Sequence, residues 1–310
     1  MTQIAPAAVP AGGSLLSHDT PPPGASPRSN KVHENRLGYL LIAPALLLLA
    51  VAFFFPVLRM VYTSITMEDG FSLERYGTIL GDPFYLEVIW RTVWIALLAT
   101  VLSLLAAYPV ALHMRQMKGR SRAILSMVIL SPLLISVVVR TLGWLLLLSP
   151  TGVINEALGL IGLGPISILN SKTAVVLGLV HVYFGYMTLS LMISVLKIDE
   201  NVMLAAADLG AKKWQIFWHV ILPLSLPGIR AGCMLVFALS ASAYITPSLL
   251  GSGTEPLLAE RVYDSALQYA DFQTSATFAT ILLFVIVAGM TLIAFATRTA
   301  SERRRKLVTK

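Results

Sequence analysis

The sequence contains few residues whose types and spacing could perform chemistry. A Walker A loop, G-x-x-x-x-G-K-[ST], is absent, and no Gly-Lys pair occurs in the 310 residues. The chain therefore cannot hold ATP phosphates in such a loop. It also lacks a His/Cys cluster with metal-ligand spacing and a nucleophile elbow, G-x-S-x-G. We expect no catalytic residue, no metal site and no cofactor on this chain.

Polar side chains within long apolar runs are the remaining candidates for chemistry. A guanidinium at the bilayer centre costs about 2.5–3.5 kcal/mol on insertion scales. Arg140 therefore either reaches the outer interface by snorkelling or faces a wet cavity or a subunit interface. Trp144 is predicted to be an interfacial anchor, and His181 either packs between helices or lines a pathway. The candidate pathway residues are Arg140, Trp144, His181, Tyr183, Tyr186, Ser242, Tyr244 and Thr246.

The segment 200–223 lies between two apolar runs but carries charges and a helical pattern of its own. Three alanines from Ala205 favour a helix with a low, smooth surface, and Gly210 is expected to end it. Apolar residues then recur at i, i+3, i+4 and i+7 over 214–221, which predicts a second short helix. We expect Pro223 and Pro227 to end that helix before the next apolar run. The residues predicted to form a docking element are Ala205, Ala206, Asp208, Gly210, Trp214, Phe217, Leu222 and Pro223.

The elements that position these residues are predicted to be membrane-spanning helices. The chain is 56% hydrophobic and only 13% charged, far less charged than a soluble domain. A span needs about 20 mostly apolar residues, and a shorter run at 157–169 is predicted to be an interfacial helix and turn. The sequence thus predicts an all-α integral membrane protein with six spans, at 37–62, 92–114, 123–148, 173–196, 229–250 and 276–296.

Basic residues gather at alternate ends of these spans, within 28–36, 115–122, 197–213 and 298–306. The other loops are mostly acidic, and the positive-inside rule then places both termini and the 200–223 segment in the cytoplasm. Residues 1–36 are rich in Ala, Pro, Gly and Ser and are predicted to be a disordered cytoplasmic tail. Residues 299–310 are predicted to be a basic cytoplasmic tail. It is interpreted as an orientation signal rather than a nucleic-acid site, because no folded basic domain accompanies it.

The 200–223 segment resembles the cytoplasmic "EAA" loop of the membrane subunits of binding-protein-dependent ABC importers, and we call it the coupling loop. The residues that fit the family pattern without a gap are Ala205, Ala206, Gly210, Val220, Leu222 and Pro223, whereas Leu204 stands in place of the family's Glu. Segments 107–111, 139–144, 152–155 and 246–251 look like those of permeases of the spermidine/putrescine branch.

This resemblance implies a type I ABC importer fold, with a six-helix permease domain over 37–298. It implies a second permease subunit, two ATP-binding subunits that hold ATP and Mg, and an extracytoplasmic solute-binding protein, all at a bacterial inner membrane. The expected solute is small and polar: polyamine-like, amino-acid-derived or phosphonate-type. Arg140 would suit an anionic or zwitterionic solute if it faces the cavity. An ion-coupled carrier or channel, or a membrane scaffold without transport, would be the rival classes.

Overall fold

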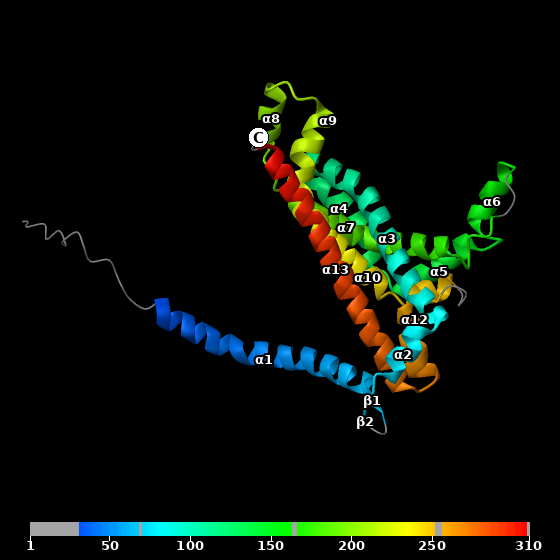
Figure 1. Ribbon diagram of the computed structural model, residues 1–310. Coiled ribbons are helices and arrows are strands. Elements are labelled where there is room, and N and C mark those ends of the chain that lie inside the picture. The colour runs from blue at the N-terminus through cyan, green and yellow to red at the C-terminus, as the bar shows by residue number, and fades with distance from the viewer. Residues whose placement is uncertain (1–30, 68–69, 163–165, 252–255, 309–310) are drawn as a thin grey trace, which may run out of the picture. The chain divides into compact units, whose positions relative to one another are not determined.

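The computed structural model describes residues 31–67, 70–162, 166–251 and 256–308. Side chains are described only from residue 43 to residue 297. The described residues are almost entirely helical (Figure 1). The first half of the chain forms α1 (Lys31–Ser64), β1 (Thr66–Met67), β2 (Gly70–Phe71), α2 (Glu74–Gly81), α3 (Pro83–Gln116), α4 (Gly119–Leu134), α5 (Val137–Leu148) and α6 (Val153–Leu160). The second half forms α7 (Lys172–Val195), α8 (Glu200–Asp208), α9 (Lys213–Ile216), η1 (Phe217–Ile221), α10 (Leu222–Ala241), α11 (Ile245–Leu250), α12 (Leu258–Tyr263), η2 (Asp264–Gln268) and α13 (Phe272–Val308).

The chain divides into two units, residues 1–55 and 56–310. In the first unit the described residues belong to α1, which begins at Lys31 rather than at the predicted residue 37. Residues 31–36 contain neither Gly nor Pro, so nothing in them stops the helix from starting early. The rest of the predicted N-terminal tail, residues 1–30, lies outside the described residues. In the second unit α13 likewise continues to Val308, through most of the predicted basic tail.

Six helical segments of the described residues are long and apolar enough to cross a membrane, as the sequence predicts. They are Ala43–Ser64, Pro83–Gln116, Val137–Leu160, Lys172–Val195, Lys213–Ala241 and Phe272–Thr297.

The third span differs from its prediction. The expected helix 123–148 is divided between α4 and α5 by Ile135 and Ser136. Pro132 lies inside α4, where it removes a backbone donor, and the helix ends two residues later at Leu134. The third candidate span then includes α6, so the helix expected within 157–169 is replaced by Val153–Leu160.

The fifth span also differs. α10 ends at Ala241, and α11 begins only at Ile245. Pro247 lies in the first turn of α11, where a backbone N–H needs no helical partner, so a helix restarts here at little cost. The predicted single helix over 229–250 is therefore wrong at its C-terminal end.

Helices α3, α7 and α10 form the centre of the second unit (Figure 1). Ile95, Leu179 and Val236, one from each helix, have no exposed surface. α7 and α10 approach closely at Gly228, where an added Cβ atom would lie 2.7 Å from Ser194 Oγ. A larger residue there would separate the two helices. Figure 1 shows α8 and α9 at one end of α10 and α13, and α12 at the other end.

Candidate coupling site and translocation pathway

The first helix of the coupling loop, α8, is defined by its two ends. The Asp199 side chain accepts a hydrogen bond of 2.9 Å from the Asn201 N–H and so caps the start of the helix. At the other end, the N–H groups of Gly210 and Ala211 donate to the carbonyls of Ala207 and Ala206. Gly210 has φ +84°, the left-handed conformation that a side chain disfavours. The predicted helix end at Gly210 is confirmed.

The second helix starts at Lys213 and does not end at either proline. The Gln215 Oε1 atom accepts a bond of 2.8 Å from the Lys212 N–H, which caps α9. The π turn η1 and then α10 continue without interruption through Pro223 and Pro227. The prediction that these prolines end the helix is therefore wrong.

The π turn explains this continuity. A proline cannot donate to the carbonyl four residues before it, and its ring clashes with that carbonyl. In η1 the Leu222 N–H instead donates to the Phe217 carbonyl, five residues back. This wider turn lies directly before Pro223 and shifts the hydrogen-bond register, so that the chain passes the proline as a helix. The second helix of the coupling loop is therefore continuous with α10 and forms one candidate span with it, Lys213–Ala241.

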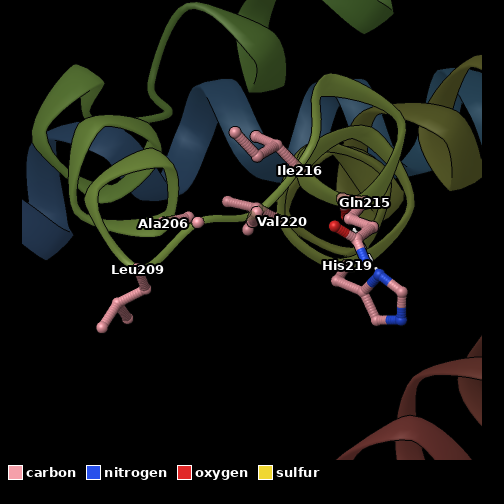
Figure 2. Close-up of a pocket in the computed structure, with 8 residues that line it drawn as sticks. Ala206, Leu209, Gln215, Ile216, His219 and Val220 are labelled. Atoms are coloured by element: carbon pink, nitrogen blue, oxygen red, sulfur yellow. Dashed lines mark hydrogen bonds between the residues drawn. The ribbon is translucent and has the colours of Figure 1, made fainter.

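A hollow of about 440 Å³ lies between α8 and the α9–η1 segment (Figure 2). Its floor is apolar, with Ala206, Ile216 and Val220 facing the space between the two helices. Leu209 is 89% exposed although it is a large apolar residue. The lining residues are Ala206, Leu209, Gly210, Ala211, Gln215, Ile216, His219 and Val220. Such an apolar rim around a shallow hollow is typical of a protein-docking surface.

The aromatic residues of the second helix form a cluster with one another. Trp214 and Phe217 stack with ring centroids 5.9 Å apart, and Trp218 meets both rings edge-on. The Phe217 ring also lies edge-on to the Tyr108 ring of α3, with the ring centroids 5.8 Å apart. The predicted apolar face thus packs against α3, although Trp214 itself stays 69% exposed. Two of the remaining predicted docking residues, Ala205 and Asp208, are exposed in α8. The other two, Leu222 and Pro223, are the first two residues of α10.

Two groups of the candidate pathway residues are brought together between α5 and α7. Trp144 Nε1 donates a hydrogen bond of 2.9 Å to His181 Nδ1. Arg140 lies within electrostatic range of the Tyr183 and Tyr186 hydroxyls. The Tyr183 hydroxyl donates a hydrogen bond of 2.9 Å to the Leu239 carbonyl of α10.

The Arg140 side chain makes a hydrogen bond within this chain. Its guanidinium donates to the Pro132 carbonyl in the last turn of α4. That carbonyl has no partner in its own helix, because α4 ends at Leu134. Arg140 therefore bridges the break between α4 and α5.

The other pathway candidates make separate contacts. Thr246 is buried and its hydroxyl lies 3.3 Å from that of Thr141, so it joins α11 to α5. The Ser242 hydroxyl, directly after α10, donates to the Ala238 and Leu239 carbonyls in the last turn of that helix. Tyr244 stacks on Tyr263 with ring centroids 4.1 Å apart.

The family model described as "Binding-protein-dependent transport system inner membrane component" matches residues 99–307, a range that holds the coupling loop and every pathway candidate. The chain belongs to this family. It is 32% identical over 251 residues to the spermidine/putrescine transport system permease protein PotB of Escherichia coli K12, covering 78% of this chain and 90% of that protein. It is also 31% identical over 228 residues to the molybdenum transport system permease protein ModB of Mycobacterium bovis, covering 73% of this chain and 84% of that protein.

The fold of this permease matches a solved structure. A chain of a bacterial alginate ABC transporter, crystallised with an alginate pentasaccharide-bound periplasmic protein, superposes with a TM-score of 0.73 at 16% identity. The match covers 87% of this permease and 96% of that chain. The protein is thus a multi-pass inner-membrane subunit of a binding-protein-dependent ABC importer. It is a transport subunit without ATPase activity of its own, and the ion-coupled carrier and scaffold alternatives are rejected.

Sequence reasoning did not single out Glu260 of the permease. This carboxyl group lies in α12, outside the candidate spans, and is only 5% exposed. Burial raises its pKa to about 7, although the nearby Arg261 lowers it. The sequence signal was weak, because Glu260 and Arg261 stand together in a segment interpreted only as an outer loop. Leu209 and His219 were not predicted for a different reason: they line a hollow between two helices, and neither residue signals that hollow in the sequence.

Proposed function

We propose that this permease imports a small polar solute, with a polyamine as the first candidate, and that a separate ATPase drives it through the coupling loop. The hollow between α8 and η1 carries this proposal. No residue of α8 is buried in this chain, and Leu209 and Ala206 present apolar surface beside it. Exposed apolar surface on such a helix is typical of a surface that another protein covers.

The orientation follows from charge. Arg115, Lys118 and Arg122 line a cavity that also reaches α8, so the basic α3–α4 junction and the coupling loop lie at the same end. The positive-inside rule places this end, and both termini, in the cytoplasm. There the loop would meet one of two ATP-binding subunits, which hold ATP and Mg. A second permease subunit would complete the pathway, and a solute-binding protein would deliver solute from outside.

The coupling loop is built as a stiff lever. Gly210 fixes the bend, the Gln215 cap fixes the start of α9, and the aromatic cluster packs the lever against α3. Because the helix runs unbroken to Ala241, a shift at α8 moves the whole fifth span. Closure of the ATPases would thereby switch the spans between inward-open and outward-open states.

The pathway is proposed to follow the surface between α5 and α7. Trp144, His181, Tyr183 and Tyr186 offer aromatic faces and polar tips there, which suit a polyamine through cation–π contacts and hydrogen bonds. The Arg140 guanidinium donates to the neutral Pro132 carbonyl and keeps its positive charge, which favours an anionic or zwitterionic solute over a polyamine. The resemblance to PotB favours a polyamine, whereas ModB, at nearly the same identity, shows that related permeases serve other solutes. Amino-acid-derived and phosphonate-type solutes are the alternatives.

The test uses the complex purified from its native membrane through a tag on this permease. An ATP-binding subunit and a solute-binding protein should copurify, and the binding protein's ligand affinities identify the solute. Proteoliposomes of the complex should accumulate labelled putrescine or spermidine only with ATP inside. Copurification without any ATP-binding subunit would refute the coupling proposal, and uptake of an anion but no polyamine would refute the substrate assignment.

A further inference from the structure

Glu260 is a buried carboxyl group that the coupling loop does not use. It lies in α12, at the opposite end of α10 and α13 from α8 and α9 (Figure 1). The Leu257 N–H lies near the carboxyl group, yet the Glu260 Oε1 atom is buried and has no hydrogen-bond partner among the described residues. A buried carboxylate without a partner is costly. A ligand that brings N–H donors and a positive charge would remove that cost.

The two arginines near Glu260 are paired with other carboxylates. Arg261 Nη2 lies 3.4 Å from Asp264 Oδ2, and Arg91 Nη2 donates a hydrogen bond of 2.5 Å to Glu87 Oε1. Both arginines act on Glu260 electrostatically. Neither donates a hydrogen bond to the Glu260 Oε1 atom within the described part of the chain. Glu260 is therefore the carboxyl group of this cluster that lacks a cation of its own.

Two tyrosines lie beside the same carboxyl group. Glu260, Tyr263 and Asp264 are spaced at i, i+3 and i+4 and so share one face of α12 and its continuation. Tyr244 stacks on Tyr263, and Glu260 and Asp264 both act on Tyr244 electrostatically. Exposure falls from 38% at Tyr263, through 18% for the Asp264 side chain, to 5% at Glu260. The cluster thus begins at the protein surface and ends at the unpartnered carboxyl group.

A primary ammonium group fits this set of side chains. It carries three N–H donors and a positive charge, and it would meet two carboxylates that accept hydrogen bonds and aromatic rings that attract cations. An anionic group would be repelled by the same carboxylates. A metal ion is a poorer match, because the described residues hold no group of three or more His, Cys, Asp or Glu side chains that could bind one.

We propose that Glu260, Asp264, Tyr244 and Tyr263 form a binding site for a primary ammonium group of the imported solute, at the outer end of the pathway. The inference rests on the proposed function, from which it takes solute import and the orientation that places α12 on the outer side. The site lies outside the candidate spans, so an arriving solute meets it before the surface between α5 and α7.

The site is joined to the α5 surface. Tyr244 is the residue directly before α11, and α11 contacts α5 through the hydroxyls of Thr246 and Thr141. Arg140 is the neighbour of Thr141 and supplies a positive charge there. A zwitterionic solute would therefore use the ammonium site and Arg140 together, whereas a polyamine would use the ammonium site alone.

The test is equilibrium binding of labelled four-carbon solutes to the purified complex in nanodiscs, without nucleotide. Putrescine carries two ammonium groups, 4-aminobutyrate carries one, and succinate carries none. Glu260→Gln removes the charge at nearly constant shape, and we expect it to weaken binding of both amines about 10–100-fold without affecting succinate. Glu74→Gln is the matched control, because Glu74 is an exposed carboxylate of α2 at the same end, and it should change nothing. Tyr263→Leu should weaken amine binding several-fold and Tyr263→Phe, which keeps the ring, much less.

The pH dependence of binding separates a ligand-binding carboxylate from a merely structural one. Burial raises the pKa of Glu260 to about 7, and the neutral acid attracts an ammonium group far less than the carboxylate does. Putrescine affinity should therefore rise as pH increases through about 7, and this rise should be lost in Glu260→Gln. The other charged groups that face Glu260, Arg91, Arg261 and Asp264, are present in both proteins. The difference between the two proteins consequently reports Glu260.

Three results would overturn the proposal. The first is equal amine binding by Glu260→Gln and the unaltered complex, and the second is binding of neither amine by the unaltered complex. The third is an equal loss in Glu260→Gln and Glu74→Gln, which would mean diffuse surface charge rather than a site. Binding of 4-aminobutyrate but not putrescine would support the ammonium site and refute the polyamine assignment. Copurification of the ATP-binding subunit, measured on the same samples, reports separately on the proposed coupling.

Discussion

The bend at Gly210 is the most specific point at which the proposed coupling can be tested. Gly210 has φ +84°, and no atom lies within 4 Å of an added Cβ atom. A substitution there consequently introduces backbone strain without a clash. The left-handed conformation costs an L-residue roughly 1–2 kcal/mol, and such a cost corresponds to a factor of about 5–30 in a conformational equilibrium.

Gly210→Val should therefore reduce the affinity of the permease for its ATP-binding subunit about 5–30-fold. Substrate-stimulated ATP hydrolysis of the assembled complex should fall in parallel. Asn tolerates the left-handed region better than other residues, so Gly210→Asn should stay close to the unaltered protein. The assay is titration of the purified ATP-binding subunit onto the permease in nanodiscs, followed by ATP hydrolysis with the loaded binding protein.

Gly159 of α6 provides the matched control. It also has open space around an added Cβ atom, but its φ is not positive. Gly159→Val should leave both measurements unchanged. The reasoning is refuted if Gly210→Val couples normally, or if Gly210→Asn and Gly210→Val are equally impaired.

Three further predictions concern other parts of the permease. Ala206→Asp places a carboxylate in the apolar floor of the coupling hollow, and should abolish substrate-stimulated ATP hydrolysis while the permease still folds, as judged by size-exclusion chromatography. Glu260→Gln should stabilise the complex above pH 7 by up to about 3 kcal/mol, measured as thermal unfolding against pH, with Glu156→Gln of exposed α6 as an inert control. Because the folded-state pKa of Glu260 is raised to about 7, the protonated carboxyl contributes its full stability below about pH 4.5, and this stability is lost as pH rises through 7. A difference in stability between Glu260→Gln and the unaltered protein that does not change with pH would contradict this. Trp144→Phe removes the donor to His181, worth about 1 kcal/mol, and should change the transport KM several-fold while binding of the ATP-binding subunit is unaffected.

Much of the fold could be predicted because its signals are local. Six long apolar runs predict six spans, and the described residues hold six candidate spans, although the third lies at Val137–Leu160 rather than at 123–148. Gly210 after three alanines indicates a helix end from sequence alone. The apolar face from Trp214 onwards likewise predicted the helix that packs against α3.

The errors came from contacts that local sequence does not encode. Pro223 ends an ordinary α-helix, but the π turn before it supplies a different hydrogen-bond register, and nothing in the residue types signals that turn. The alternatives for Arg140, the outer interface or a wet cavity or subunit interface, stay predictions, but both assumed a single straight span. The break at Ile135 and Ser136 instead frees a carbonyl at Pro132 for it to bind. Glu260 depends on the packing of α12, which the sequence presents only as a loop.

The central claim is that the coupling loop meets a separate ATPase at the cytoplasmic face. Leu209→Cys, in a background where the natural Cys233 is replaced by Ala, tests it most directly, because Leu209 is 89% exposed at the rim of the hollow. The account predicts that this cysteine is labelled by membrane-impermeant maleimide only in inside-out vesicles. It also predicts a cross-link to the ATP-binding subunit in the native membrane. Labelling from the outer face, or a complete absence of cross-linking to a second polypeptide, would contradict it.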